Sequence, residues 1–304
     1  MGRRSAGAPI CIGGPAFVTH RIDYNNWLPN VAARYYLTSS WSVYAQWAYG
    51  SIIPPSGVFD VPNAQVLVPP KPTLAKTYQT GSVLKFRRWT LDADAYYIHF
   101  QNSYDSYIDP ASLEPVFVPT GPTNTKGVEA ESNIVIGRGL SLYVNGTMGV
   151  AKYQTGSNFP NGGLWVANTP KNVETASLLW RHHDWSIGLV DKRVGTLYND
   201  NGTVSYLING IQIPFPVDEA VKIDPFNVVN LFVNYTVRSR SWLRGSKIGL
   251  AVNNLADSHN VVGITPAIAA TAAVPYAQNS GDLLNLLPGR SVMVTFTAGW
   301  APRR

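Results

Sequence analysis

In the stretch GLSLYVNGTMGV, residues 139–150, apolar and polar side chains alternate along the chain. The apolar set falls on one side of an extended chain and consists of Leu140, Leu142, Val144, Met148 and Val150. The polar set falls on the other side and consists of Ser141, Tyr143, Asn145 and Thr147. Successive side chains of a strand point to opposite faces, so the stretch predicts a β-strand with two unlike faces.

The same pattern returns along the whole chain. It is found in WSVYAQWAY (41–49), WTLDADAYY (89–97), NVVNLFVNYTV (227–237) and RSVMVTFTAGW (290–300). Counting similar segments predicts about eleven strands of about ten residues each, and no stretch shows the 3.6-residue period of a helix. The chain is therefore expected to be all-β.

The connections between these strands alternate between short and long. Short links are expected at Ser39 and Ser40, Arg87 and Arg88, Gly137–Gly139, His182 and His183, and Ser239–Gly245. Long links rich in Pro, Gly and Asn are expected at Ile52–Thr73, Asn102–Lys126, Tyr153–Thr169, Tyr198–Asp224 and Ala256–Pro288. An antiparallel meander with tight turns at one end and long links at the other is typical of an outer-membrane β-barrel. Soluble sandwiches mix their link lengths, and propellers need a sequence repeat that is not found here.

The composition favours a strand wall in a membrane. Only 14% of the residues are charged, against roughly 25% in soluble proteins. The predicted polar faces hold Ser, Thr, Asn, Gln and Tyr, which suits a wet lumen, and the apolar faces then meet lipid. No run approaches the roughly 18 to 20 apolar residues of a transmembrane helix. Aromatic residues near strand ends, which fit interfacial girdles, are Trp41, Trp89, Trp180, Trp185 and Trp300.

Charge and cysteine content exclude other classes. The formal charge is +6, but the basic residues form no dense run, so nucleic-acid binding is not expected. Arginines gather instead at the predicted short turns, as Arg87, Arg88, Arg138, Arg181, Arg238, Arg240 and Arg244. The single cysteine, Cys11, excludes an internal disulfide and is interpreted as an incidental thiol. Pro and Gly interrupt the start of the chain, which makes a poor signal peptide.

Two pairs of side chains are weighed for chemistry. Asp92 and Asp94 share one strand face about 7 Å apart, a spacing that paired catalytic carboxylates also use. No second feature supports a sugar-cleaving site, so we interpret this pair as polar lining of the lumen. His182 and His183 are neighbours in a predicted tight turn, and on a strand they point apart, so they are not expected to hold a metal ion.

The remaining residues give no catalytic pattern. His20, His99 and His259 are isolated from one another, and the chain has no Gly-x-Ser-x-Gly elbow, phosphate loop or dinucleotide fingerprint. We therefore expect a protein that is not an enzyme, with no catalytic residue, no cofactor and no resident metal site.

Several longer strings resemble the β-barrel of TonB-dependent receptors. A hairpin with a Gly-Val-Glu-Ala-Glu strand and a final strand that begins with Pro-Gly-Arg are similar to recurrent motifs of this family. The matching strings are NNWLPNVAARYYLTSSWSVYAQWAYG (25–50), NTKGVEAESNIVIGRGLSLYVNGTMGVAKY (124–153), NTPKNVETASLLW (168–180), KIGLAVNNLADSHN (247–260) and LPGRSVMVTFTAGW (287–300). They follow the order of the family from Trp27 to Trp300.

The resemblance implies the C-terminal half of a 22-stranded barrel in the outer membrane. It implies uptake of a ferric siderophore or another large nutrient, with outer-membrane lipid and the TonB complex as partners. Ligand contacts are then best sought in the links Asn102–Lys126 and Tyr198–Asp224. Glu129 and Glu131 share a face that, in this family, looks towards the plug and the channel, so we expect a structural role for them and no metal site.

The family also has a signal peptide, a TonB box and a plug domain, which are not visible in this sequence. We therefore expect residues 1–26 to be an irregular leader that is not native to the fold, residues 27–300 to be the receptor-like segment, and 301–304 a short tail. The alternatives are a passive porin, a surface adhesin, or a truncated receptor without function. A secreted β-rich hydrolase or lectin would require a chain that is soluble without detergent.

Overall fold

The computed structural model describes residues 22–54, 70–108, 115–119, 121–155, 162–199, 203–208, 211–216, 219, 221–238, 243–268 and 276–299. Every regular element in these ranges is a strand. Across the same residues, no helix has the length and apolar character needed to span a membrane. Cys11, His20, Trp300 and the predicted tail 301–304 lie outside the described residues, as does the leader up to residue 21.

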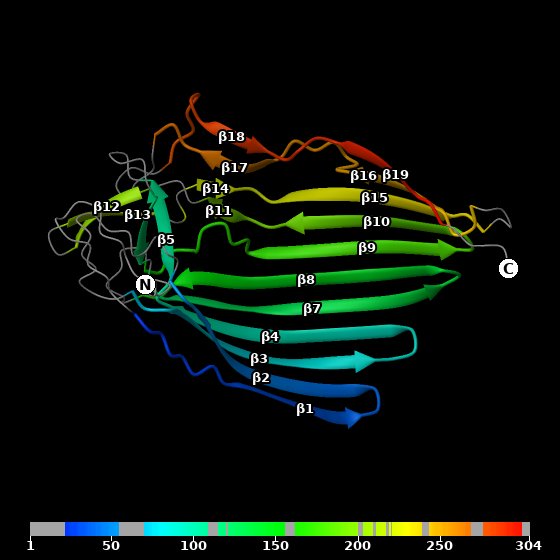
Figure 1. Cartoon of the computed structure of the whole chain (residues 1–304), viewed down its shortest axis with the longest axis horizontal. Helices are drawn as coiled ribbons and strands as arrows, with labels where there is room; N and C mark the ends of the chain where they lie inside the picture. The colour runs from blue at the N-terminus through cyan, green and yellow to red at the C-terminus, as the bar shows by residue number, and fades with distance from the viewer. Residues whose placement is uncertain are drawn as a thin grey trace, which may run out of the picture.

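Eleven strands form one antiparallel sheet in the order β1-β2-β3-β4-β7-β8-β9-β10-β15-β16-β19. Their bounds are β1 Asn30–Thr38, β2 Trp41–Ile52, β3 Thr73–Lys85, β4 Trp89–Gln101, β7 Thr123–Gly137, β8 Leu140–Tyr153, β9 Asn172–His182, β10 Trp185–Val194, β15 Phe226–Thr236, β16 Lys247–Asn253 and β19 Ser291–Thr297. Figure 1 shows them side by side in a curved sheet with β1 and β19 at opposite edges. The predicted all-β meander is confirmed. Among the described strands, none pairs with the outer side of β1 or β19.

The register places the polar residues of each strand beside polar residues of its neighbours, and the apolar residues beside apolar ones. Asp94 lies opposite Gly81 on β3 and Glu129 on β7, whereas the next residue, Ala95, lies opposite Thr80 and Val128. We call the side with Asp94 and Glu129 the polar face and the side with Ala95 and Val128 the apolar face. Because a slip of one residue would exchange the two faces of a strand, the sheet keeps two distinct surfaces.

Large apolar side chains of the apolar face are exposed. Met148 on β8 is 64% exposed, Val292 on β19 is 62% exposed and Phe296 is 61% exposed. Soluble monomers rarely expose a continuous apolar surface that crosses a whole sheet. The apolar face therefore has the character of a wall that contacts lipid.

Four of the five predicted short links are confirmed and lie at one end of the sheet, on the right in Figure 1. The fifth, Ser239–Gly245, falls between β15 and β16 at the same end, but residues 239–242 lie outside the described residues. Several of their residues have left-handed backbone conformations: φ is +52° at Arg138, +81° at Gly139 and +49° at His183. A Cβ atom at Gly139 would lie 1.8 Å from the carbonyl oxygen of Arg181 on β9. Only glycine fits there, because the turn and the neighbouring strand approach each other along the backbone.

Tryptophans mark the same end on the apolar face. Trp41, Trp89 and Trp185 are the first residues of β2, β4 and β10, directly after short turns. The indole of Trp41 donates to Ser82 Oγ over 2.8 Å, and that of Trp89 donates to Ser132 Oγ over 2.9 Å. The amphipathic ring is thus satisfied at its polar atom. The prediction of aromatic residues near strand ends is confirmed for these three and for Trp180 on β9.

The opposite end carries the long links, and four small sheets form there that the sequence does not predict. They pair β5 Tyr104–Ile108 with β6 Pro115–Pro119, β11 Leu197–Asn199 with β14 Val221–Ile223, β12 Thr203–Ile208 with β13 Ile211–Pro216, and β17 Val261–Thr265 with β18 Leu283–Leu286. The predicted boundary of the link 102–126 is also wrong, because β7 begins at Thr123. The Thr and Asn residues at the start of β7 read as link residues by composition, although their backbone already pairs with β4.

The long links pack against one another and, together with the adjoining ends of β8 and β16, hold the buried apolar residues of the described part of the chain. Val221 and Ile223 of β14 are 0% and 2% exposed, and Trp165 is 5% exposed. The Asn199 side chain donates to the Ile264 carbonyl oxygen over 2.9 Å, which joins two different links. Among the described residues, the buried apolar side chains therefore lie at and above the long-link end of the sheet, and not between two layers of it.

Candidate functional site

Four carboxylates meet on the polar face. The register places Asp92 opposite Glu131 and Asp94 opposite Glu129, so two acidic pairs lie side by side on β4 and β7. They line a hollow of about 440 Å³ whose other side is formed by β8, β9 and Lys192 of β10. Like charges directly opposite each other destabilise a sheet, so this arrangement needs hydrogen-bond donors, solvent or a cationic partner.

Two tyrosines supply hydrogen bonds to this acidic group. The Tyr44 hydroxyl lies 3.1 Å from Asp92 Oδ1 and 3.2 Å from Asp94 Oδ2, and the Tyr143 hydroxyl donates to Glu131 over 3.0 Å. Tyr44 reaches across β3 because Gly81 leaves room: a Cβ atom there would lie 2.5 Å from the Tyr44 ring. A side chain on Gly81 would therefore separate Tyr44 from the carboxylates.

The carboxylates of the hollow can attract cationic groups. No described group of three or more His, Cys, Asp or Glu side chains is arranged to hold a metal ion. Asp94 Oδ1 is buried and has no hydrogen-bond partner among the described residues. The interpretation of Asp92 and Asp94 as lumen lining, and of Glu129 and Glu131 as structural residues, stays a prediction that this placement supports.

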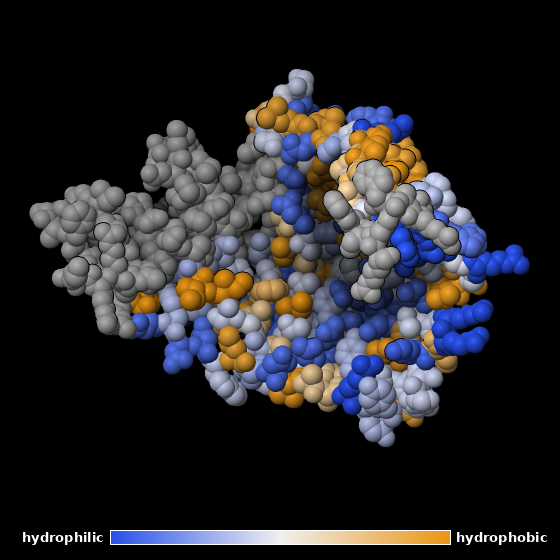
Figure 2. Space-filling view, turned by 45° about the vertical axis from the view of Figure 1, so that its right-hand side comes forward, coloured by the Kyte–Doolittle hydropathy of each residue, from blue (hydrophilic) through white to orange (hydrophobic). Residues whose placement is uncertain are grey.

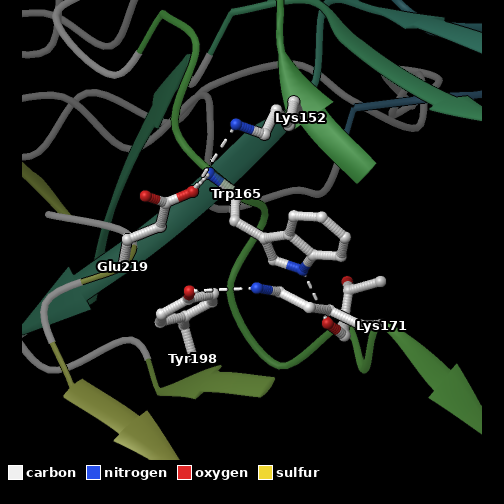
Figure 3. A network of polar contacts seen from close by, with 6 residues as sticks. Lys152, Trp165, Lys171, Tyr198 and Glu219 are labelled. Atoms are coloured by element: carbon white, nitrogen blue, oxygen red, sulfur yellow. Dashed lines mark hydrogen bonds and ion pairs between the residues drawn. The ribbon is translucent and has the colours of Figure 1, made fainter. Parts of the chain in front are cut away.

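A second group of side chains joins two long links above β8, β9 and β10 (Figure 3). We call it the Trp165 cluster; it consists of Lys152, Trp165, Lys171, Tyr198 and Glu219. The Trp165 backbone N–H donates to Glu219 Oε1 over 2.7 Å, and its indole donates to the Thr169 carbonyl oxygen over 2.7 Å. Lys152 lies 3.9 Å from the same Glu219 oxygen.

Lys171 lies between the two aromatic rings of the Trp165 cluster. Its ammonium is 5.3 Å from the centroid of Trp165 and 5.1 Å from that of Tyr198, and it donates to the Tyr198 hydroxyl over 3.2 Å. Backbone hydrogen bonds from Asn168 to Tyr198 and from Lys171 to Thr196 fasten the same two links. The cluster therefore fixes the base of the link 153–172 to the base of the link 194–226.

The long link between β16 and β19 is fixed by aspartates. Arg290 donates its backbone N–H to Asp257 Oδ1 over 2.7 Å, which lowers the pKa of that carboxyl group. Asp282 accepts backbone N–H groups from Ala267 and Asn279, both over 2.9 Å, and these bonds lower its pKa as well. Both carboxylates act as acceptors for backbone groups, which is a structural role.

The histidines behave only partly as predicted. His182 and His183 do lie at the short turn between β9 and β10, but their rings touch with centroids 4.1 Å apart, so the expectation that they point apart is wrong. The left-handed backbone of His183 turns its side chain back towards His182. His99 lies on the apolar face, where its Nδ1 is 2.6 Å from Asn124 Oδ1. His259 lies close to Gly289, 3.3 Å from a Cβ built there.

The sequence alone does not indicate the Trp165 cluster. Its members lie at residues 152, 165, 171, 198 and 219, and no local pattern connects them. The one hint in the sequence is Trp165 itself, because a large aromatic residue in a link rich in Gly and Asn often packs against other parts of the protein.

Comparison with protein families gives a direct match. The model of the β-barrel of TonB dependent receptor-like proteins matches residues 7–255. The chain belongs to this receptor β-barrel family. The match covers the acidic hollow, the Trp165 cluster and the strands from β1 to β16. No curated protein sequence matches the chain.

Solved receptors share the fold at low sequence identity. The ferric yersiniabactin uptake receptor FyuA from Yersinia pestis has a TM-score of 0.60 at 20% identity, over 88% of this chain and 36% of its own. The ferric-catecholate import receptor Fiu from K12 E. coli has a TM-score of 0.61 at 18% identity, over 95% of this chain and 39% of its own. The copper transporter OprC has a TM-score of 0.61 at 16% identity, over 88% of this chain and 38% of its own.

The chain thus spans less than two fifths of the length of these receptors. Their fold is shared, whereas their ligands belong to them. The predictions of an outer-membrane β-barrel fold and of the family are confirmed.

Proposed function

We propose that the chain forms part of the wall of an outer-membrane receptor that takes up a ferric siderophore or another large nutrient. The long links would face the outside and contact the ligand, and energy would come from the TonB complex. Binding and gating would need no covalent chemistry, so the protein would not act as an enzyme.

The observation that carries this proposal is the two-faced sheet with all its long links at one end. The apolar face exposes large apolar side chains and the polar face carries the acidic hollow, which fits a wall between lipid and a wet lumen. The five short turns at the other end fit a periplasmic rim. Figure 2 shows hydrophilic residues gathered on the right, the side that carries these turns in Figure 1.

The packed links support ligand binding at the opposite end. A large ligand needs a surface that keeps its shape, and the Trp165 cluster fixes two links to each other at their bases. The link 194–226 also contains the strands β12 and β13, and it overlaps the stretch Tyr198–Asp224, which is predicted to contact the ligand.

The proposal is tested by producing the full chain in a Gram-negative host, separating the membranes, and titrating the detergent-solubilised protein with a panel of ferric catecholate, ferric citrate, ferric phenolate and copper complexes. We expect the chain in the outer-membrane fraction. We also expect quenching of tryptophan fluorescence by one class of complex at micromolar concentration. The matched control is Trp165→Ala, which should weaken this binding while the protein stays in the membrane.

Two results would overturn the proposal. Recovery of the folded chain in the soluble fraction without detergent would exclude a membrane wall. A membrane-inserted chain that binds no complex of the panel, but lets small solutes leak from liposomes, would instead identify a passive pore.

A further inference from the structure

Basic and polar side chains form a continuous row on the apolar face, close to the long-link end. Cross-strand pairing aligns them over five strands, from β2 to β8. This rim row consists of Tyr49, Lys76, His99, Asn124 and Lys152. It holds two lysines and a histidine but no carboxylate.

A second row lies one step deeper along the same strands. It consists of Trp47, Tyr78, Tyr97, Lys126 and Val150, each opposite the next. Tyr78 and Tyr97 pack with centroids 6.3 Å apart. Tyr and Trp prefer the boundary between lipid tails and headgroups, so this row marks the depth at which headgroups begin.

A hollow lies directly below these aromatic side chains. It measures about 560 Å³ and is bounded by Trp47, Tyr78 and Tyr97. Its floor holds small side chains, at Ala33, Ala45, Thr80 and Ala95. A hydrocarbon chain fits a trough bounded by small side chains and aromatic rings, because most of the surface that it contacts is apolar.

Two lysines lie next to residues that bound this hollow: Lys126 is opposite Tyr97, and Lys76 is two residues before Tyr78 on the same face of β3. Lys126 is exposed and, among the described residues, its ammonium has neither an ion pair nor a hydrogen bond. Lys76 lies on the other side of β4 and rests on the Tyr49 ring, 5.3 Å from its centroid. The strands β3 and β7 are two strand spacings apart, roughly 10 Å, so flexible lysine stems from both can reach one anion above Tyr97 and His99.

We infer that this part of the apolar face is a binding site for a phosphate-bearing anionic lipid. The phosphate lies between Lys76 and Lys126, beside His99, and an acyl chain fills the hollow below the aromatic row. The inference rests on the proposed membrane location, since it requires lipid at this face, and it adds a specific lipid to that proposal.

The arrangement fits a lipid better than a free anion. The two lysines lie next to residues that line a largely apolar trough, so a ligand with both a phosphate and a hydrocarbon chain makes contacts that inorganic phosphate cannot make. Lys152 is already close to Glu219, at 3.9 Å, and is therefore not assigned to the site.

The test uses the full chain in detergent micelles and native mass spectrometry, with dioleoyl phosphatidic acid as the probe and dioleoyl phosphatidylcholine as the uncharged reference. We expect one phosphatidic acid molecule to bind at least about tenfold more tightly than the reference. Lys76→Gln and Lys126→Gln should each weaken it about fivefold, which corresponds to the attraction of one lysine near a membrane surface. Lys76→Arg should keep the affinity.

The matched control is Lys192→Gln, which removes the same charge from the polar face and should leave phosphatidic acid binding unchanged. Equal binding of both lipids, or equal effects of all three glutamine variants, would contradict the site while leaving the membrane location intact. Full displacement of phosphatidic acid by inorganic phosphate would identify an anion site without a lipid component. Failure of the chain to associate with any micelle or vesicle would instead contradict the proposed membrane location.

Discussion

The two ends of the sheet are held by different means. At the short-turn end, links of a few residues close by backbone hydrogen bonds, left-handed residues and the tight contact between Gly139 and Arg181. At the long-link end, the Trp165 cluster and the aspartates of the link between β16 and β19 join segments that are far apart in the sequence. The structure of the short-turn end depends on backbone conformation, whereas that of the long-link end depends on particular side-chain contacts.

This difference teaches where each end tolerates change. A short turn accepts many side chains, because they point outward, but it rejects a Cβ atom where two backbones meet. A long link accepts insertions and many backbone shapes, but it loses its position when one central side chain is removed. Substitutions should therefore reduce the stability of the two ends for different physical reasons.

The largest effect is expected at the Trp165 cluster. Trp165→Ala removes a side chain that is only 5% exposed and should reduce the local stability of the long-link end by about 3 to 5 kcal/mol. Hydrogen exchange at the amides of Tyr153 and Val166, which bond across this link, measures it. Trp165→Phe keeps a ring but loses the bond to Thr169, and should cost about 1 to 2 kcal/mol. If the amides of the short turns lost as much protection as these, the two ends would not be independent.

The second effect belongs to the short-turn end. Gly139→Ala forces a Cβ atom into the Arg181 carbonyl group and should cost about 3 kcal/mol, measured by urea unfolding in detergent. Gly137→Ala is the matched control, since Gly137 has a positive φ of +126° but nothing within 4 Å of a Cβ atom. It should cost about 1 kcal/mol, from backbone strain alone. Similar losses in both variants would argue against the close approach of β9.

A smaller effect is expected from Lys171→Met. The methionine keeps most of the apolar stem but loses the contacts of the ammonium with Trp165 and Tyr198, worth about 1 kcal/mol. Exchange of the Asn168 amide, which bonds to Tyr198, should become faster by about fivefold. Lys192→Met on the polar face should leave this amide unchanged.

The smallest effect is expected from pH. The folded pKa values of Asp257 and Asp282 are lowered, so their stabilisation is complete above the unfolded value of about 4 and is lost as the pH falls through the lower folded values. Cleavage of the segment 254–290 by pepsin should therefore accelerate as the pH is reduced from about 4 towards 2, beyond the change in pepsin activity on an unfolded substrate. Asp282→Asn should be cleaved readily already at pH 4. A wild-type rate that follows the unfolded control throughout would contradict this role.

The sequence predicts the sheet well because strand alternation is a local property. Leu140 to Val150 show two faces within twelve residues, and the link lengths then give the direction of each strand. What the local pattern lacks is the register. It places Asp92 with Asp94, and Glu129 with Glu131, but it does not show that the two pairs face each other across β4 and β7.

The long-link end could not be predicted for a related reason. The strands β11 and β14 are separated by more than twenty residues, and their pairing is decided by packing of Val221 and Ile223 and not by a turn between them. The side-chain contacts of Trp165 with Lys171 and Glu219 likewise depend on how two long links fold over one another. Period-two patterns contain no information on such contacts.

The order of the strands limits which further strands could pair with the two edges of the sheet. In an antiparallel sheet of eleven strands, the first and the last run in the same direction, so β1 and β19 both run from the long-link end to the short-turn end. A second copy of this sheet, rotated about the axis of the wall, would bring like-directed edges together and would need parallel seams. Antiparallel seams on both sides require an insert with an odd number of strands. The parity of the sheet therefore selects against a simple pair of identical halves.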